Sequence, residues 1–154
     1  MTLAISPPQP KAARPARVEP SLGTTRDPGR LLVVEDDLDY RDLIATALRA
    51  AGVPMSVEWV ESGFAALSRL RAQRGELSLP RVVILDHRLP GIRGLDVLRA
   101  IKHDSHPDIR RVPVAMLTSS ARPEDCELAY HEGALSFMTK PHTFEALVRH
   151  LDRV

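Results

Sequence analysis

Four places in this sequence carry side chains that could do chemistry, and each directly follows a short run of mostly apolar or β-branched residues. Glu35 and Asp36 follow LLVV, and Asp86 follows VVIL. Thr118 follows VAML, and Lys140 follows SFMT. Taken singly, such a residue could be a helix cap, a turn residue or a solvated side chain. Their occurrence after four separate apolar runs favours one shared site.

The carboxylates among these residues indicate which chemistry the site supports. Carboxylates held close together raise one another's pKa unless a cation lies between them, and Lys140 supplies only one positive charge. A small set of hard oxygen ligands suits Mg²⁺, which keeps several waters and often binds phosphate too. The sequence contains neither a glycine-rich P-loop nor G-x-G-x-x-G, so we expect no nucleotide cradle. We expect a metal and phosphoryl site in which one carboxylate is itself the phosphoryl acceptor.

These side chains meet only if the apolar runs form neighbouring strands. From residue 31 onward, short apolar runs alternate with longer segments whose apolar residues recur at intervals of three and four, which is typical of β–α repetition. We expect strands at 31–35, 57–60, 82–86, 112–117 and 135–139. We expect helices at 39–51, 63–73, 95–103, 123–132 and 143–152. Five such units predict a doubly wound α/β fold: a five-stranded parallel sheet with helices on both faces and ligands at the carboxyl ends of the strands.

Length and charge exclude several function classes. The 154 residues correspond to one domain, and 44% hydrophobic residues supply a core without disulfides. The single cysteine, Cys126, cannot form an internal disulfide. Twenty-one basic against twenty acidic side chains argue against nucleic acid or an anionic membrane as principal partner, and no apolar run approaches the roughly 18 residues of a membrane span. We therefore expect a cytoplasmic protein that binds neither.

The first thirty residues differ from the rest. Residues 1–30 hold six of the thirteen prolines and lack apolar periodicity, so they cannot bury enough surface to offset the entropy of ordering. We expect a disordered, proline-rich tail at 1–30 and a folded domain at 31–154. The basic character of the tail leaves a partner-binding arm open as an alternative.

Four motifs in 31–154 carry a family resemblance: LLVVEDD, VILDHRLPGIRG, AMLTSSA and ALSFMTKP. In this order they resemble the receiver domain of two-component response regulators, which implies a flavodoxin-like sheet of strand order 2-1-3-4-5. The segments IKHDSHPDIRRVPVAMLTSS and AYHEGALSFMTKP are similar to the single-domain regulators paired with bacterial phytochromes. The resemblance thus implies a sensor histidine kinase as partner, with a bacteriophytochrome as the candidate.

The resemblance also implies roles for the residues of the metal and phosphoryl site. Asp86 would accept the phosphoryl group from a phosphohistidine of the kinase. Mg²⁺ would be held by Asp36, Asp86 and the backbone carbonyl of Arg88, with Glu35 acting through water. Lys140 would neutralise charge on the transferred group.

A further implied role is a switch. The Thr118 hydroxyl would bind the phosphoryl group and draw its loop inward, and Phe137 would fill the vacated space. The chain ends soon after the last expected helix, so we expect a single-domain regulator that signals through a protein–protein surface. We expect a homodimer through 123–132, 135–139 and 143–152, where side chains of both charges suit an isologous contact.

Two other classes remain as alternatives. A Mg²⁺-dependent aspartyl-phosphate phosphatase also uses a strand-end Asp nucleophile, but such enzymes carry a second Asp two residues later, where this chain has Arg88. A flavodoxin-like cofactor binder shares the fold, but three carboxylates would repel a cofactor phosphate. We therefore expect a phosphoacceptor module and not an enzyme.

The remaining reactive side chains receive no function from the sequence. The Arg88 side chain either leans over the phosphoryl group and obstructs an attacking water, or extends into solvent. Cys126 lies on an expected amphipathic helix, where we expect it to be inert. No metal-ligand spacing such as H-E-x-x-H occurs among the six histidines, which we expect at surface or loop positions. They are His87, His103, His106, His131, His142 and His150.

Overall fold

The structure is a computed structural model that describes residues 29–72, 79–119, 122–141 and 143–151. Residues 1–28 of the predicted tail lie outside the described residues. Arg30, which the sequence assigned to the tail, is the first residue of the first strand, so this strand begins one residue before the predicted residue 31.

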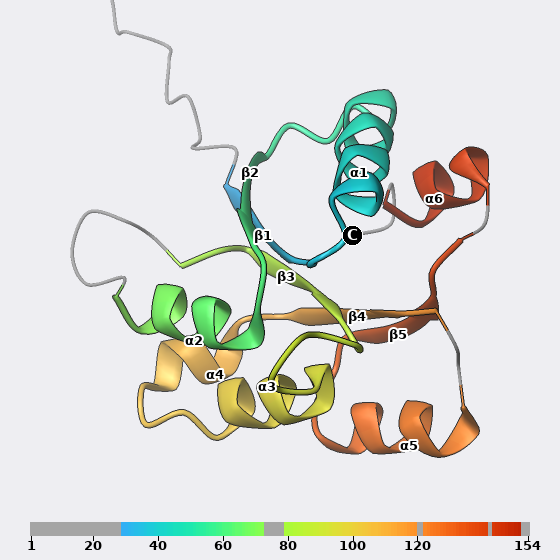
Figure 1. Ribbon diagram of the computed structural model, residues 1–154. Helices are drawn as coiled ribbons and strands as arrows, with labels where there is room; N and C mark the ends of the chain where they lie inside the picture. The colour runs from blue at the N-terminus through green and yellow to red at the C-terminus, as the bar shows by residue number, and fades with distance from the viewer. Residues whose placement is uncertain (1–28, 73–78, 120–121, 142, 152–154) are drawn as a thin grey trace, which may run out of the picture.

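The five predicted strands form one parallel sheet of order β2-β1-β3-β4-β5, which confirms the fold class (Figure 1). The strands are β1 (Arg30–Val34), β2 (Ser56–Val60), β3 (Val82–Asp86), β4 (Val114–Thr118) and β5 (Ser136–Thr139). The helices are α1 (Leu38–Ala50), α2 (Gly63–Ala72), α3 (Gly94–Lys102), α4 (Pro107–Arg111), α5 (Pro123–His131) and α6 (Phe144–Leu151). In the described part of the chain, no helix is long and apolar enough to cross a membrane.

Two hydrophobic layers hold the helices to the sheet, because successive strand residues point to opposite faces. On one face, Leu32 and Leu85 belong to the layer that packs under α2, α3, α4 and α5. On the other face, Leu31 and Ile84 belong to the layer under α1 and α6. The central strands β1, β3 and β4 are therefore buried on both faces, as the continuous apolar runs predicted.

One helix was not predicted, and it displaces the start of a strand. α4 has a proline in its first turn but only one buried residue, Ile109, so it carries too few apolar residues to show a helical period. Val112 ends this helix by donating its N–H to the Ile109 carbonyl. Pro113 has no N–H to give to the sheet, so β4 begins at Val114 instead of the predicted residue 112.

Candidate functional site

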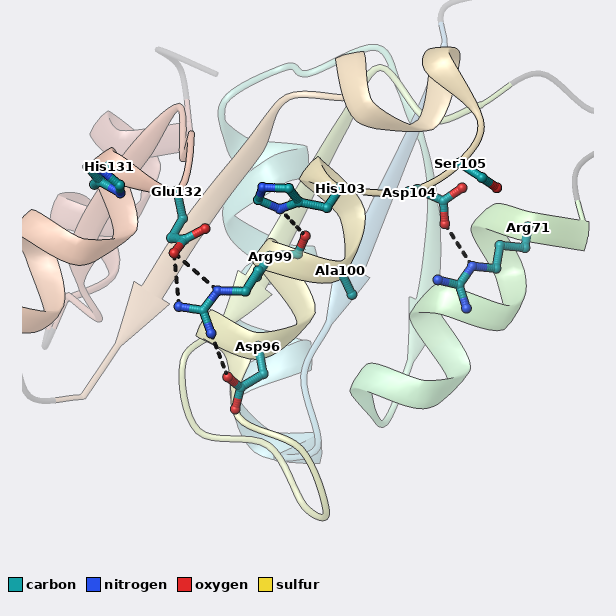
Figure 2. A pocket seen from close by; sticks show the side chains of 9 residues that line it. All are labelled: Arg71, Asp96, Arg99, Ala100, His103, Asp104, Ser105, His131 and Glu132. Carbon is teal, nitrogen blue, oxygen red and sulfur yellow. Dashed lines mark hydrogen bonds and ion pairs between the residues drawn. The ribbon is translucent and has the colours of Figure 1, made fainter.

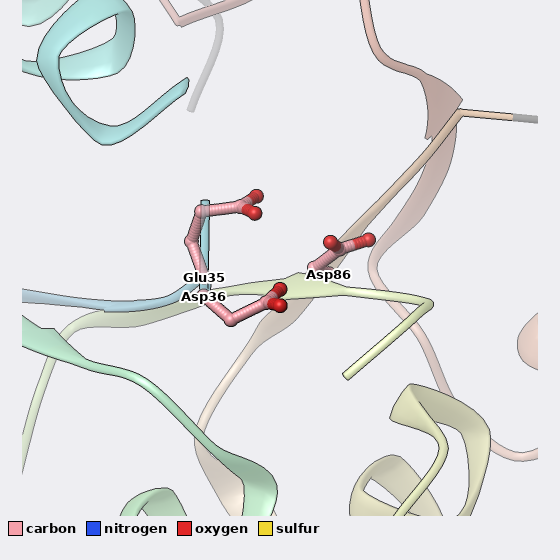
Figure 3. A group of neighbouring side chains, drawn as sticks. All are labelled: Glu35, Asp36 and Asp86. Atoms are coloured by element: carbon pink, nitrogen blue, oxygen red, sulfur yellow. The ribbon is translucent and has the colours of Figure 1, made fainter. Parts of the chain in front are cut away.

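Three carboxylates converge where β1 and β3 end. Glu35 and Asp36 directly follow β1, and Asp86 is the last residue of β3, which pairs with β1 along its length. Their side chains point toward one another, and one oxygen from each lies within 4.8 Å of the others (Figure 3). Glu35 and Asp86 are buried, with 1% and 4% of their surface exposed, whereas Asp36 is exposed. Asp36 therefore lies on the solvent-exposed side of the cluster, and the other two carboxylates lie on its buried side.

Lys140 bridges the two buried carboxylates. Its Nζ lies 2.7 Å from Glu35 Oε2 and 2.8 Å from Asp86 Oδ2. The residue follows β5 and donates its backbone N–H to the Thr118 carbonyl at 2.6 Å, which ties it to the end of β4. Burial opposes the charge of Lys140, but hydrogen bonds from the ammonium to Asp86 and Glu35 outweigh this and raise its pKa. Lys140 is therefore held as a cation inside the cluster.

The charges of the cluster do not cancel. Burial, together with the negative charge of Asp86, raises the pKa of Glu35 above its ordinary value in spite of the opposing Lys140 ammonium. Three carboxylates with one ammonium leave an excess of negative charge in a partly buried place. This excess is what a bound divalent cation would neutralise.

Two backbone N–H groups orient the buried carboxylates. The Asp37 N–H donates to Glu35 Oε1 at 3.2 Å, and the Arg88 N–H donates to Asp86 Oδ1 at 3.0 Å. Each buried carboxylate thus accepts one backbone hydrogen bond and one from Lys140. The loop after β3 is thus tied to the Asp86 carboxylate through the Arg88 N–H. The Arg88 carbonyl as a metal ligand stays a prediction.

These donors fit a small, hard cation such as Mg²⁺ or Mn²⁺, which prefers carboxylate and carbonyl oxygens and water. The exposed position of Asp36 leaves the cluster open to solvent, so a metal here could keep some of its waters. Within the described ranges, this is the only group of three His, Cys, Asp or Glu side chains close enough to hold a metal ion. The structure thus brings together Glu35, Asp36, Asp86 and Lys140, as their strand-end positions predicted.

The two expected switch residues lie on the neighbouring strands. Thr118 is the last residue of β4 and is fully buried, one position after the Leu117 that pairs with Asp86. Phe137 lies in β5, pairs with Met116 and is 8% exposed. Thr118 is therefore at the carboxyl edge of the sheet and Phe137 lies level with the middle of β4. Their movement on phosphorylation stays a prediction.

His87 lies in the loop directly after β3, as expected for the histidines, and its side chain makes contacts that the sequence did not predict. Its side chain is only 13% exposed, and its ring stands edge-on to Phe137, with the ring centroids 5.9 Å apart. Nε2 lies 3.5 Å from Asp125 Oδ2, in the first turn of α5. The residue after Asp86 thus links the end of β3 to β5 and α5. The sequence offers no signal for this contact, because it joins segments that are distant in the chain.

Tyr40 is a second residue that the sequence did not single out. The Lys140 ammonium lies 4.4 Å from the centroid of its ring. The Tyr40 hydroxyl is buried and has no hydrogen-bond partner among the residues that the structure describes. The ring therefore lies against the acidic cluster, from the first turn of α1.

The Arg88 side chain, for which two placements were open, reaches the adjacent loop. It is exposed, and its guanidinium donates a hydrogen bond to Ser119 Oγ, in the segment after β4. It therefore connects the loops that follow β3 and β4, two residues after Asp86.

A groove of about 690 Å³ lies elsewhere, beside the carboxyl end of α3 (Figure 2). Its charged side chains pair with one another: Arg99 lies 2.9 Å from Glu132, and Arg71 lies 2.8 Å from Asp104. Figure 2 shows the two pairs on opposite sides of His103. Because these charges are already paired, we assign the groove a structural role in joining α2, α3 and α5.

Comparison with known proteins agrees with this geometry. The model of the response regulator receiver domain family matches residues 31–152. The chain is 39% identical over 129 residues to the probable methanogenesis regulatory protein FilR2 of Methanothrix harundinacea, covering 83% of this chain and 82% of FilR2. It spans about half the length of several other curated relatives, which are DNA-binding response regulators.

Two solved structures are similar over most of their length. One is the phosphorylated cyanobacterial phytochrome response regulator RcpA, with a TM-score of 0.70, 32% identity, and coverage of 81% of this chain and 89% of RcpA. The other is the Mn²⁺-bound form of response regulator Rcp1, with a TM-score of 0.70, 28% identity, and coverage of 81% and 90%.

Proposed function

The chain belongs to the response regulator receiver domain family, and on that premise we propose that Asp86 accepts a phosphoryl group from a sensor histidine kinase with Mg²⁺ bound in the acidic cluster. Receiver domains are signalling modules that act with such kinases and bind a divalent cation at an acidic site. The observation that carries the proposal is the arrangement around Asp86. The carboxylate ends β3, a partly buried ammonium lies 2.8 Å away, and two further carboxylates lie within 4.8 Å.

In the proposed reaction, an Asp86 oxygen forms a bond to phosphorus while the bond between phosphorus and the kinase imidazole breaks. The leaving imidazole keeps the bonding electron pair and takes up a proton. Lys140, already within hydrogen-bond distance of Asp86, would follow the transferred group and bind one of its oxygens. Asp36, Asp86 and the Arg88 carbonyl would hold Mg²⁺, with Glu35 acting through water. The metal would supply positive charge for the phosphoryl oxygens.

We propose a bacteriophytochrome as the kinase. The supporting observation is the 32% identity to RcpA, which is described as a phytochrome response regulator. Histidine kinases draw their phosphoryl group from ATP, so the proposal places this protein in the cytoplasm.

We propose that phosphorylation of Asp86 changes the positions of Thr118 and Phe137 and thereby the surface of the protein. Thr118 would bind a phosphoryl oxygen and draw its loop toward the site. Phe137, which is buried beside His87, would then move into the space that this loop vacates. The Phe137 N–H donates to the Tyr130 hydroxyl, so such a movement would reach α5. We propose that the surface of α5, β5 and α6 carries the signal and forms a homodimer, with Tyr130 and Leu135 among its exposed apolar side chains.

The experiment is to incubate the protein with Mg²⁺ and acetyl phosphate and to measure its intact mass. We expect one base-labile phosphoryl group on the wild type and none on Asp86→Asn, whose amide keeps the shape but lacks a nucleophilic oxygen. Asp42→Asn, on the exposed side of α1, removes the same charge and should be labelled normally. Undiminished labelling of Asp86→Asn would place the acceptor elsewhere and refute the proposal.

A further inference from the structure

We infer that Tyr40 is a positioning residue for phosphotransfer: its ring face holds the Lys140 ammonium in place between Glu35 and Asp86. This inference rests on the proposed function, because Lys140 matters for the reaction only if Asp86 accepts the phosphoryl group.

The first observation is the contact geometry around the ammonium. An ammonium has three N–H donors, and here two hydrogen bonds go to Glu35 and Asp86. The ammonium also contacts the face of the Tyr40 ring, with Lys140 Nζ 4.4 Å from the ring centroid. A cation within about 6 Å of a ring centroid is attracted to the negative face of the ring. Lys140 is therefore enclosed by two carboxylates and one aromatic face.

The second observation is that the backbone of Tyr40 is itself held. Asp37 is the N-cap of α1, and its side chain accepts hydrogen bonds from the backbone N–H groups of Asp39 at 2.9 Å and Tyr40 at 3.2 Å. Tyr40 thus belongs to a capped first turn that begins directly after the acidic pair of β1. This anchoring gives the ring a defined position, whereas the four-carbon stem of a lysine is flexible.

The third observation concerns the hydroxyl. It is buried and unpartnered within the described part of the chain. Burial, with the charges of Glu35 and Asp86, raises the pKa of Tyr40, so the side chain stays neutral near pH 7. The ring is therefore an uncharged aromatic face. Because the hydroxyl makes no hydrogen bond here, phenylalanine should provide the same contact, which makes Tyr40→Phe the conservative variant.

During transfer the ammonium must leave a carboxylate oxygen and bind a phosphoryl oxygen a short distance away. A ring face attracts the ammonium without directional hydrogen bonds, so it can keep Lys140 in the cleft through this change of partners. Without the ring, we expect the Lys140 side chain to explore solvent and the transfer to slow by about three- to tenfold, the range of a partly buried cation–π contact.

Two measurements test this with the full chain. The first is the proton NMR shift of the Lys140 side-chain methylene next to Nζ, recorded without metal. A ring face shifts nearby protons upfield, so we expect an upfield shift in the wild type and in Tyr40→Phe and its loss in Tyr40→Leu. The second is the labelling rate with Mg²⁺ and acetyl phosphate. We expect Tyr40→Phe to be labelled at close to the wild-type rate and Tyr40→Leu to be slower. Leu38→Ala, a truncation of an exposed side chain in the same turn, should match the wild type in both measurements.

Three results would overturn the inference. These are a wild-type methylene shift without ring-current displacement, wild-type labelling of Tyr40→Leu, or labelling of Tyr40→Phe as slow as that of Tyr40→Leu. The last result would assign the effect to the hydroxyl instead of the ring face. Absence of labelling in the wild type would refute the proposed function, whereas the methylene shift decides the ring contact independently of phosphorylation.

Discussion

Replacing Asp36 by asparagine should make the metal-free protein more stable and should weaken its response to Mg²⁺. The substitution keeps the size of the side chain and removes one of three clustered negative charges. It leaves the hydrogen bonds from Lys140 to Glu35 and Asp86 in place. Substitution of Asp36 therefore tests the charge repulsion in the cluster alone, whereas substitution of Glu35 or Asp86 would also remove a hydrogen bond from Lys140.

The separation of the charges sets the size of the effect. Two like charges 4.8 Å apart repel by about 0.9 kcal/mol at the dielectric constant of water and by about 3.5 kcal/mol at an effective value near 20. Asp36 is exposed, which favours the lower figure for its repulsion by Glu35 and by Asp86. Attraction to the Lys140 ammonium offsets part of this sum. We therefore expect Asp36→Asn to raise the free energy of unfolding by about 1–2 kcal/mol without metal, or a few degrees in Tm.

The assay is urea unfolding of both proteins in the presence of a chelator and again in Mg²⁺. Mg²⁺ at ten times its dissociation constant stabilises a protein by about 1.4 kcal/mol. We expect the wild type to gain this stability and Asp36→Asn to gain clearly less at the same concentration. Asp42→Asn is the matched control, because it removes the same charge from an exposed position on α1 and should change stability by less than about 0.5 kcal/mol.

Two results would refute this reasoning. If Asp36→Asn were less stable than the wild type in chelator, repulsion within the cluster would not be a net cost. If both proteins gained equal stability from Mg²⁺, Asp36 would not be a ligand.

Three further predictions follow. Asp104→Asn should cost about 1–3 kcal/mol of stability, because the buried carboxylate accepts hydrogen bonds from a backbone N–H and from Arg71. These bonds lower the pKa of Asp104 in the folded protein below its ordinary value of 3.8, so the stability that they contribute is present above pH 3.8 and is lost as the pH falls through the folded pKa. In urea unfolding, the difference in stability between the wild type and Asp104→Asn should therefore shrink in strong acid. A difference that stays constant with pH would contradict this. Arg88→Ala should release phosphate about threefold faster, since the side chain spans the loops beside Asp86; equal release rates would leave Arg88 without a protective role. Light scattering should detect a dimer that Leu135→Asp disrupts, and a monomeric wild type at every concentration and salt level, with and without beryllofluoride, would exclude that surface.

The fold and the acidic cluster followed from local features of the sequence. Runs such as 82–85 are apolar throughout, which is typical of a strand that is buried on both faces. A polar residue that ends such a strand, such as Asp86, lies at the carboxyl edge of the sheet. Asp86 and Lys140 could therefore be placed at one edge, because each is covalently attached to the end of its own strand. The helix α4 escaped prediction because five residues are too few to show a helical period.

The contacts of Tyr40 and His87 were decided by the tertiary structure alone. Tyr40 meets Lys140 because β1 lies beside β3 and α1 packs on the same face of the sheet as α6. His87 meets Phe137 and Asp125 because β4 and β5 extend the sheet on the far side of β3. Periodicity along a chain reports which face of an element is buried. It carries no information about which side chain of a distant element lies opposite, because that depends on strand order and helix packing.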